Sequence, residues 1–566
     1  MSESKFYSGN AFIVNFFFFC YTMLMNTIRK MPIGVQSFEK LITNVFFYVD
    51  KTEYIWNLVQ NPAPYFLSRP RRFGKSLLLS TLKAYFLGQK ELFKGLTIEK
   101  FEEAEKEKRE IWQEYPVLYL DFNLSKYETR EDLESLLNNH LCRWEELYGS
   151  KDSENTLTER FFGVINRSYE KTGKQAVVLI DEYDKPLLQT MWKDEALNET
   201  YRTILKGFFG VIKSADQYLR FAFLTGVTKF SKVSIFSDLN NLRDLSLLSD
   251  YSAVCGISQD ELEADFQPEI AALAENNSLT YEEALAKLKQ RYDGYLFARK
   301  GKAMYNPFSL LNVFASREFS SYWFATGTPT FLVEYLKKAY YNIPDLDGNV
   351  KMNESGLEAY RADAINPLPI LFQSGYLTIK DYNDFSRLYR LGFPNDEVRY
   401  GFLDNLLPAY TPIRTDKTGL SIWEFYEQIV AGDVDGFMQK MKGIISGIPY
   451  DNLTEKDLAL REQNYQTAVY LVFALMNQFV STEVHCTTGR ADCIVEFKDK
   501  VYIFEFKLTS NGSAEDAVKQ IKEKNYADKY SGSGKKIIAI GSSFDEEKRT
   551  IKDWVVCNSG DFTDKL

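Results

Sequence analysis

One short segment constrains the fold of this chain more than any other. Tyr65–Ser68 predicts a short apolar strand, a basic turn follows it, and Gly74-Lys75-Ser76 opens a helix that is expected to extend to about Leu87. A strand, a tight turn and a helix N-terminus in this order are typical of a phosphate-binding loop, in which backbone N–H groups hold phosphate oxygens. The segment therefore predicts an α/β domain that binds a nucleotide.

The residues of this loop have expected roles. Lys75 would reach the β- and γ-phosphates, the hydroxyl of Ser76 would ligate Mg²⁺, and Gly74 belongs to the same phosphate cradle. The usual pattern has a glycine five residues before Gly74, and this chain has Arg69 there. Arg69 and Arg72 would place guanidinium groups near the phosphates and replace the lost backbone contacts. Two alternatives stay open, namely solvated turn residues and docking points for another domain.

A second strand with acids at its end supports the nucleotide site. Val177–Ile180 is a run of four apolar residues, which is typical of a buried parallel strand. Asp181 and Glu182 follow directly, at the edge where open α/β sheets bind ligands. Asp181 would hold the Mg²⁺ shell, and Glu182 would polarise the attacking water. A solvated loop would explain this acid pair if it stood alone, but the upstream loop favours the nucleotide site.

Two further strands complete the expected sheet. Leu219–Gly226 contains Thr225 near its end, whose hydroxyl can sense the γ-phosphate, and Val117–Phe122 is another apolar strand. The loop, the acids and Thr225 occur in the chain order expected of a nucleotide site, which favours that interpretation over a solvated loop. Arg243 is a candidate arginine finger, although a structural salt bridge explains it equally well.

Length and composition limit the classes of function. A chain of 566 residues suggests several domains, and its net charge of −10 argues against general attraction to polyanions, although a local basic groove is compatible with it. The chain has only 2 histidines, which nearly excludes histidine general-base chemistry and sites with several histidine ligands. Its 6 scattered cysteines form no paired framework, which fits a reducing, cytoplasmic compartment.

The first residues differ from the rest of the chain. Ala11–Leu24 is an apolar run that is too short to span a bilayer, and it lacks the basic start and the cleavage site of a signal peptide. We therefore expect residues 1–30 to be an N-terminal extension that precedes the native start. A membrane anchor is the less favoured alternative, and no stable membrane association is expected.

A helix–hairpin–helix pattern occurs in the middle of the chain. Leu368–Gly375 and Glu397–Leu407 predict helices, and between them Tyr376–Ile379 and Leu388–Pro394 predict two strands. This order is typical of a winged-helix module, which can bind DNA. Few lysines and arginines accompany it, so a packing role is favoured.

The C-terminal part contains a second group of charged residues on predicted strands. Ala491–Phe497 and Val501–Lys507 predict a hairpin about a polar turn, preceded by a helix over 462–479 and followed by a helix over 514–529 and a final strand over 536–540. Strand alternation puts Glu505 and Lys507 on one face, together with Val501 and Ile503. A hairpin that turns near residues 498–499 sets Asp492 opposite Glu505.

Two opposed carboxylates on an apolar face repel each other unless a partner neutralises them. A divalent cation with oxygen ligands, Mg²⁺ or Mn²⁺, would bind between Asp492 and Glu505. Lys507 would then orient or deprotonate a water, or stabilise the charge that develops on a phosphate. An Asp followed by Glu-x-Lys on neighbouring strands therefore predicts a hydrolytic metal site. The alternative is a buried ion pair between Lys507 and either acid.

Several short motifs together indicate a family resemblance. They are Met31–Gly34, Tyr48–Thr52, Ser68–Ser76, Asp181–Asp184, Leu224–Val227, Tyr322–Gly327, Gly489–Asp492 and Glu505–Lys507. The first six resemble the AAA-ATPase-like family of bacterial proteins, whose pattern includes an arginine at the first glycine of the loop. The last two, with the helix and strand order around them, resemble the PD-(D/E)XK nuclease superfamily.

The resemblance implies a division of the chain into domains. It implies a P-loop ATPase with a parallel sheet over residues 31–255 and a helical, winged-helix-like region over 256–425. Residues 426–566 would form an α/β domain like that of restriction endonucleases.

The resemblance also implies roles for single residues. Asp492 and Glu505 would be metal ligands, and Lys507 would be the catalytic lysine. Glu462 would be an accessory acid, and Gln520 would position water or DNA.

The sequence supports three hypotheses about function. The first is an ATP-controlled nuclease that acts on nucleic acid, with DNA preferred over RNA as the expected substrate. The second is a regulatory nucleotide switch whose C-terminal domain only binds nucleic acid or a protein partner. The third is a nucleotide site that binds without turnover. A homo-oligomer is compatible with each of them.

Overall fold

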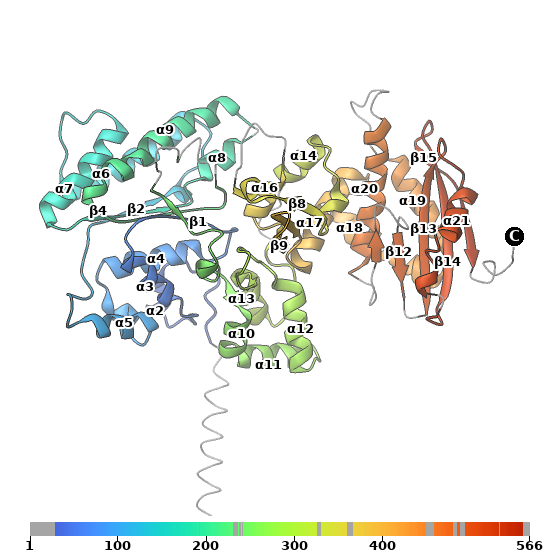
Figure 1. Ribbon diagram of the computed structural model, residues 1–566, viewed down its shortest axis with the longest axis horizontal. Helices are drawn as coiled ribbons and strands as arrows, with labels where there is room; N and C mark the ends of the chain where they lie inside the picture. Colours follow the sequence, from blue (N-terminus) through green and yellow to red (C-terminus); the bar gives the residue numbers. More distant parts are fainter. Residues whose placement is uncertain are drawn as a thin grey trace, which may run out of the picture. The chain divides into compact units, whose positions relative to one another are not determined.

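The computed structural model describes residues 29–191, 193–229, 236, 239, 241–324, 330–358, 366–448, 458–478, 484–486, 493–497, 499–530 and 532–558 (Figure 1). Contacts divide the chain into two compact units. One unit holds Met1–Trp323, Met352–Ala364 and Leu368–Arg390, and the other holds Phe324–Lys351, Ile365–Pro367 and Leu391–Leu566.

A five-stranded parallel sheet forms the centre of the first unit, in the order β2-β3-β4-β1-β5. Its strands are β1 (Pro64–Ser68), β2 (Val117–Asp121), β3 (Ala176–Asp181), β4 (Leu219–Gly226) and β5 (Arg243–Asp244). Every residue of β3 is buried, as its continuous apolar run predicted. The predicted α/β fold with a parallel sheet is therefore confirmed.

Helices cover both faces of this sheet, with α6 to α9 above it and α2 to α5 below it in Figure 1. They are α2 (Phe38–Thr43), α3 (Thr52–Gln60), α4 (Lys75–Phe86), α5 (Thr97–Glu105), α6 (Arg130–Tyr148), α7 (Leu157–Thr172), α8 (Lys185–Thr190) and α9 (Glu195–Ser214). The helix predicted after the loop is confirmed as α4.

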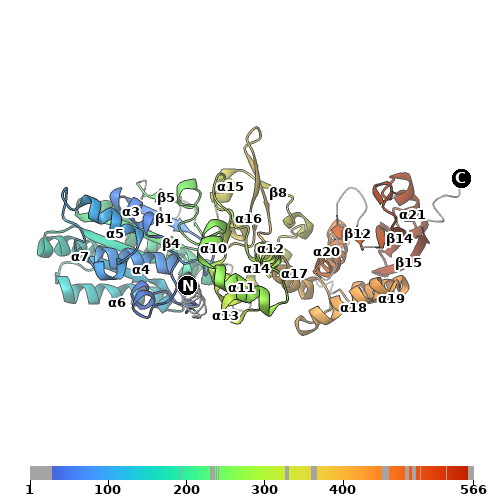
Figure 2. The same ribbon diagram turned by 90° about the horizontal axis from the view of Figure 1, so that it is seen from below.

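A group of short helices follows the sheet in the same unit (Figure 2). They are α10 (Gln259–Asp265), α11 (Gln267–Asn276), α12 (Tyr281–Tyr292) and α13 (Pro307–Ser316). Asn306 caps α13, because its side chain accepts hydrogen bonds from the N–H groups of Phe308 and Ser309. Pro307 stands at the first helical position, where its missing N–H does no harm.

The predicted helix–hairpin–helix order is confirmed. It consists of α16 (Leu368–Gln373), β9 (Thr378–Asn383), β10 (Leu388–Gly392) and α17 (Asp396–Tyr410). A third short strand, β8 (Val350–Met352), pairs with β10 and gives the order β8-β10-β9. Two further helices precede this segment, α14 (Thr330–Lys338) and α15 (Glu354–Glu358).

The second unit contains a mixed sheet in the order β11-β12-β13-β14-β15, in which β13 and β14 run parallel and the other pairs are antiparallel. The strands are β11 (Val484–Cys486), β12 (Cys493–Glu496), β13 (Lys500–Leu508), β14 (Lys536–Asp545) and β15 (Thr550–Asn558). The helices around this sheet are α18 (Thr418–Ala431), α19 (Val434–Ser446), α20 (Leu458–Met476) and α21 (Ala514–Glu523).

Two predicted elements of this sheet differ from the structure. The strand expected over 536–540 extends to Asp545, and β15, which was not predicted, pairs with it. Ser542 and Ser543 made this stretch look polar, but both are buried, and their hydroxyls donate to the backbone carbonyl and the carboxylate of Asp553 in β15. The helix expected over 514–529 ends earlier, at Glu523.

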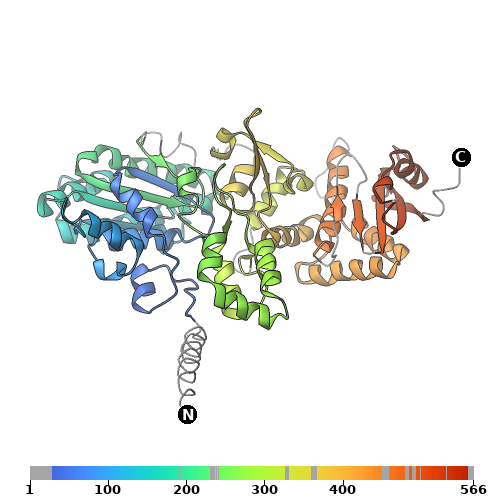
Figure 3. The same ribbon diagram turned by 60° about the horizontal axis from the view of Figure 1, so that its bottom comes forward.

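The α21 helix packs closely on β14. A Cβ atom added to Gly541 would lie 2.2 Å from the carbonyl oxygen of Ala514 and 2.7 Å from the nitrogen of Val518. The apolar residues that α21 covers include Val501 and Ile503, on one face of β13. The orange helices in Figure 3 (α18 to α20) belong to the other face, where Phe437 of α19 lies 5.6 Å from Phe504. Successive side chains of β13 therefore lie on opposite faces of the sheet, as predicted.

No helix in the described part of the chain is long and apolar enough to cross a membrane. The apolar run Ala11–Leu24 lies outside the described residues, so its interpretation as an extension stays a prediction. The domain boundaries placed at residues 255 and 425 also stay predictions.

A substitution of Gly541 tests the close contact between α21 and β14. We expect Gly541→Ala to destabilise the protein by about 1–3 kcal/mol, because the added methyl group meets helix backbone that cannot turn aside. Gly443→Ala is the matched control, since Gly443 lies exposed on α19 with nothing within 4 Å of the added Cβ. Urea unfolding of the full chain measures both. Equal stability of the two variants would contradict the packing described.

Candidate functional site

The predicted phosphate-binding loop connects β1 to α4. Gly74 adopts a left-handed conformation (φ 95°) at the start of the helix, which a residue with a Cβ would adopt only with strain. Lys75 is buried, and its ammonium donates hydrogen bonds to the carbonyl oxygens of Arg69 (2.9 Å) and Pro70 (3.0 Å). The loop thus folds around the lysine that was expected to bind phosphates. Ser76 follows it in the first turn of the helix.

Arg69 does not take the position that the sequence suggested. Its side chain is 1% exposed, and the guanidinium lies 4.2 Å from the ring centroid of Phe297. Its N–H groups donate to the carbonyl oxygens of Ser68, Ser246 and Tyr251. Burial lowers its pKa to about 10. A guanidinium enclosed in this way joins core segments, so we correct the expectation that Arg69 contacts phosphate.

The other arginines of interest lie at the surface. Arg72 is exposed, and its guanidinium stands 4.0 Å above the ring of Phe308. Its backbone is left-handed (φ 66°), so the turn is tight at this point. Arg243 is exposed on β5, and no salt bridge to it is seen among the described residues. Its neighbour Asp244 forms an ion pair with Lys229.

The acids predicted at the end of β3 lie beside the predicted sensor. The hydroxyl of Thr225 donates a 2.6 Å hydrogen bond to Asp181, and both side chains are buried. Their closeness follows from the sheet order, because β3 and β4 are parallel neighbours whose carboxyl ends lie at one edge. The structure thus brings Asp181 and Thr225 together.

Glu182 follows Asp181 in a strained conformation. Its backbone is left-handed (φ 50°), which is uncommon for a residue other than glycine. Burial and the charges of Asp184 and Asp181 raise the pKa of its carboxyl group, whereas the charges of Lys75 and Arg71 oppose the rise. The charge of Lys75 therefore acts on the carboxyl group of Glu182, as is expected if both belong to one site.

A further acid, Asp121, stands at the same edge and was not predicted as a site residue. It pairs in register with Asp181 across β2 and β3. Burial, with the charge of Asp181, raises its pKa. The sequence did contain a signal for Asp121 as a site residue, because Asp121 ends β2 as Asp181 ends β3. Repulsion among these carboxylates is what a divalent cation relieves, so the residues fit Mg²⁺.

No three His, Cys, Asp or Glu side chains in the described ranges are grouped tightly enough to hold a metal ion by themselves. An ion near Asp181 would therefore take further ligands from Ser76, phosphate oxygens or water.

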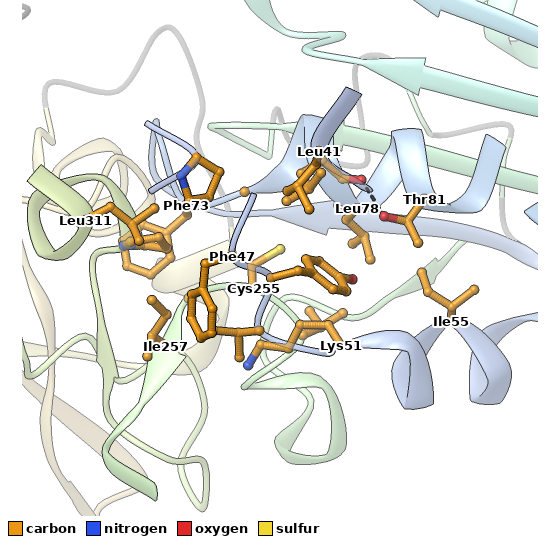
Figure 4. Close-up of a pocket in the computed structure, with 18 of the residues that line it drawn as sticks. Leu41, Phe47, Lys51, Ile55, Phe73, Leu78, Thr81, Cys255, Ile257 and Leu311 are labelled. Carbon is orange, nitrogen blue, oxygen red and sulfur yellow. Dashed lines mark hydrogen bonds between the residues drawn. The ribbon is translucent and has the colours of Figure 1, made fainter. Parts of the chain in front are cut away.

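A cavity of about 110 Å³ lies behind the loop (Figure 4). Its lining is mostly apolar and comes from α4, from the segment that precedes α3 and from the residues that follow β5. Lys51 stands at this cavity, donates to the carbonyl oxygen of Ala253 at 3.0 Å and pairs with Glu261. The labelled lining residues are Leu41, Phe47, Lys51, Ile55, Phe73, Leu78, Thr81, Cys255, Ile257 and Leu311. Sequence reasoning did not find this cavity.

The second candidate site lies on β13, beneath α21. Glu505 is 3% exposed, and the ammonium of Lys507 lies 3.5 Å from one of its carboxylate oxygens. Gln520 of α21 donates to Glu505 through its amide nitrogen and accepts from Lys507 through its amide oxygen. One amide thus connects the acid and the lysine. The structure brings together three of the predicted site residues.

Two other predicted residues of this site lack a described side chain. Asp492 lies outside the described residues. The pairs from Cys493 with Phe504 to Glu496 with Val501 have the register that was expected to set Asp492 opposite Glu505. Glu462 lies within α20, and its side chain is outside the description. Both roles stay predictions.

Comparison with known proteins gives two family matches. Residues 32–236 match the family described as Predicted AAA-ATPase, and residues 460–554 match the PD-(D/E)XK nuclease superfamily. A protein of Azotobacter chroococcum mcd 1, named "Uncharacterized protein in vnfD 5'region", is 36% identical over 539 residues, which cover 94% of this chain and 99% of that protein.

The matched ranges contain both candidate sites, and the similarity to the Azotobacter protein extends over nearly the whole of each chain. The chain therefore belongs to the AAA-ATPase-like family and has a PD-(D/E)XK nuclease superfamily domain at its C-terminal end.

Proposed function

We propose that this protein binds and hydrolyses ATP in its first unit and that its C-terminal domain is a metal-dependent nuclease that acts on DNA. The observation that best supports ATP hydrolysis is the arrangement at the sheet edge, where the hydroxyl of Thr225 bonds to the buried carboxylate of Asp181. The nucleotide state would control cleavage.

In the proposed ATP site, Lys75 neutralises the β- and γ-phosphates, and exposed Arg72 adds a second positive charge. Glu182 accepts the proton of the attacking water, and the hydroxyl of Thr225 keeps Asp181 oriented. Mg²⁺ would be held by Ser76 and Asp181, and it would neutralise the charge that develops on the phosphates. The apolar cavity behind Gly74 suits a purine base, because its walls offer aromatic and aliphatic contacts.

In the proposed nuclease site, Glu505 and Asp492 would hold a divalent cation, which activates water and stabilises negative charge on the phosphate. Lys507 donates to the reacting phosphate or its leaving oxygen. Gln520 keeps the carboxylate and the ammonium in a fixed relation, because its amide contacts both. Burial of Glu505 favours a charged partner over water, which supports a bound cation.

A regulatory switch is the second candidate. The direct ion pair between Glu505 and Lys507 favours it, because such a pair neutralises the acid without a metal. The C-terminal domain would then bind nucleic acid or a protein partner without cleavage.

Two substitutions test ATP hydrolysis. Lys75→Ala is expected to weaken ATP binding by at least about tenfold, because a charged hydrogen-bond donor to the phosphates is lost. Glu182→Gln is expected to keep binding and to lower turnover by about 100-fold or more, because the amide cannot accept the proton. Phosphate release and equilibrium binding measure the two effects. Lys90→Ala, an exposed lysine outside the loop, is the control. Wild-type turnover in both variants would exclude the proposed hydrolysis.

Cleavage assays test the nuclease site. Purified protein is incubated with linear DNA, circular DNA and RNA, with and without ATP, in Mg²⁺ or Mn²⁺. We expect DNA cleavage that Glu505→Ala and Lys507→Ala lower by about 100-fold or more, while DNA binding persists. Lys548→Ala, an exposed lysine in the turn between β14 and β15, should retain activity. If the wild type binds nucleic acid but never cleaves it, the regulatory function replaces the nuclease.

A further inference from the structure

The phosphate-binding loop is enclosed by aromatic side chains from the segment that follows the sheet. Phe73 lies in the loop and is fully buried. Its ring centroid is 4.8 Å from that of Tyr295 and 5.2 Å from that of Phe297. Arg72 stands over Phe308. The loop therefore cannot move without disturbing these contacts.

A tryptophan reaches the backbone of the same loop. The indole N–H of Trp323 donates a 3.3 Å hydrogen bond to the carbonyl oxygen of Arg71, and its ring lies 5.1 Å from that of Tyr376. Trp323 is 8% exposed, so this bond is shielded from water. Next to Tyr376, a Cβ atom on Gly375 would lie 2.6 Å from the ring of Pro70. The turn after α16 thus packs directly against the loop.

A separate set of contacts starts from the acids. One carboxylate oxygen of Asp184, which is fully buried, accepts hydrogen bonds from the N–H groups of Val227 (2.9 Å) and Thr228 (2.6 Å) and from the Thr228 hydroxyl (2.8 Å). This carboxylate ties the turn after β3 to the segment after Thr225.

The same segment continues to α16. The N–H of Lys229 donates a 2.8 Å hydrogen bond to the side-chain oxygen of Gln373, and the amide nitrogen of Gln373 donates to the carbonyl of Leu357 at 2.8 Å. Gln373 is 7% exposed. Its amide oxygen and its amide nitrogen thus each bond to a backbone group, in a buried setting where loss of either bond is costly.

Both sets of contacts end on one corner of the fold. Gln373, Gly375 and Tyr376 lie within four consecutive residues, where α16 ends and β9 is about to begin. We propose that Gln373 and Trp323 are positioning residues of the nucleotide site, which hold the acid-bearing and phosphate-binding loops and report the nucleotide state to this corner. This inference rests on the proposed ATP site.

Competition for Lys75 would make the residues around Gln373 and Tyr376 sensitive to bound nucleotide. Bound phosphates compete with the carbonyls of Arg69 and Pro70 for its ammonium, and the carbonyl held by Trp323 belongs to the next residue. A shift of the loop backbone therefore changes the environment of the indole. From these residues the chain continues through β9 into β10, and it passes into the second unit within β10, at Leu391. Nucleotide binding would thus reach the segment that leads to the nuclease domain.

Two variants test the proposal in the full chain. Gln373→Met removes both amide bonds at similar size, and Trp323→Phe keeps a ring beside Tyr376 and removes only the N–H donor. For both we expect turnover of ATP to fall by about tenfold while the affinity for a methylanthraniloyl-labelled ATP changes less than about threefold, since neither residue is among those proposed to bind the nucleotide. Trp144→Phe is the control, because Trp144 is buried in α6 against Phe161.

Tryptophan emission reports the environment of the Trp323 indole. If Trp323 only stabilised the fold, its emission would not change when nucleotide binds. Wild-type protein and Trp144→Phe should change emission when Mg·ATP is added, and Trp323→Phe should lose most of this change. An emission change equal to that of the wild type in Trp323→Phe, or wild-type turnover in both test variants, would overturn the proposal.

Lys75→Ala separates this inference from the proposed function. If the wild type and Lys75→Ala bind the labelled ATP equally, the proposed ATP site fails, and the inference fails with it. If Lys75→Ala loses binding but Gln373→Met and Trp323→Phe behave as the wild type does, only the positioning role is wrong.

Discussion

The position of β4 between β1 and β3 is the constraint on which the candidate nucleotide site depends. The loop follows β1, the acids follow β3, and Thr225 stands near the end of the strand between them. Parallel strands bring these three ends to one edge, although they are far apart in the sequence. The hydrogen bond between Thr225 and Asp181 is the direct result. Without this strand order, each of the motifs would be an isolated turn.

Buried charges then tie more distant segments to this edge. Arg69 has three backbone carbonyls as partners, and Asp184 has two backbone N–H groups and a hydroxyl. A buried charge is costly unless hydrogen bonds satisfy it, so each of these side chains requires particular partners in a particular place. Arg69 thereby joins the loop to residues 246–251, and Asp184 joins the acids to the segment after β4.

The second candidate site depends on a close approach of helix and sheet. Gly541 has no side chain, so the backbone of α21 can lie against β14. Gln520 projects from this helix and bonds to Glu505 and Lys507 on the neighbouring strand. The amide of Gln520 thus holds the carboxylate of Glu505 and the ammonium of Lys507 in a fixed relation. This arrangement is compatible with metal-assisted cleavage and with a structural ion pair, and the two differ in whether a divalent cation binds to Glu505.

Local pattern was enough to predict strands β1 to β4, β12 and β13, the helix after the loop, the helix–hairpin–helix order and the register of the β12–β13 pair, because continuous or alternating apolar runs specify burial directly. It was not enough for residues whose role depends on partners from elsewhere in the chain. The direction of Arg69, the pairing of Asp121 with Asp181 and the two contacts of Gln373 follow from strand order and from the packing of distant segments. The sequence by itself determined which chemical groups are present and which strands present them. Only the tertiary structure decided which groups meet, because buried polar atoms bond to whatever the fold places beside them.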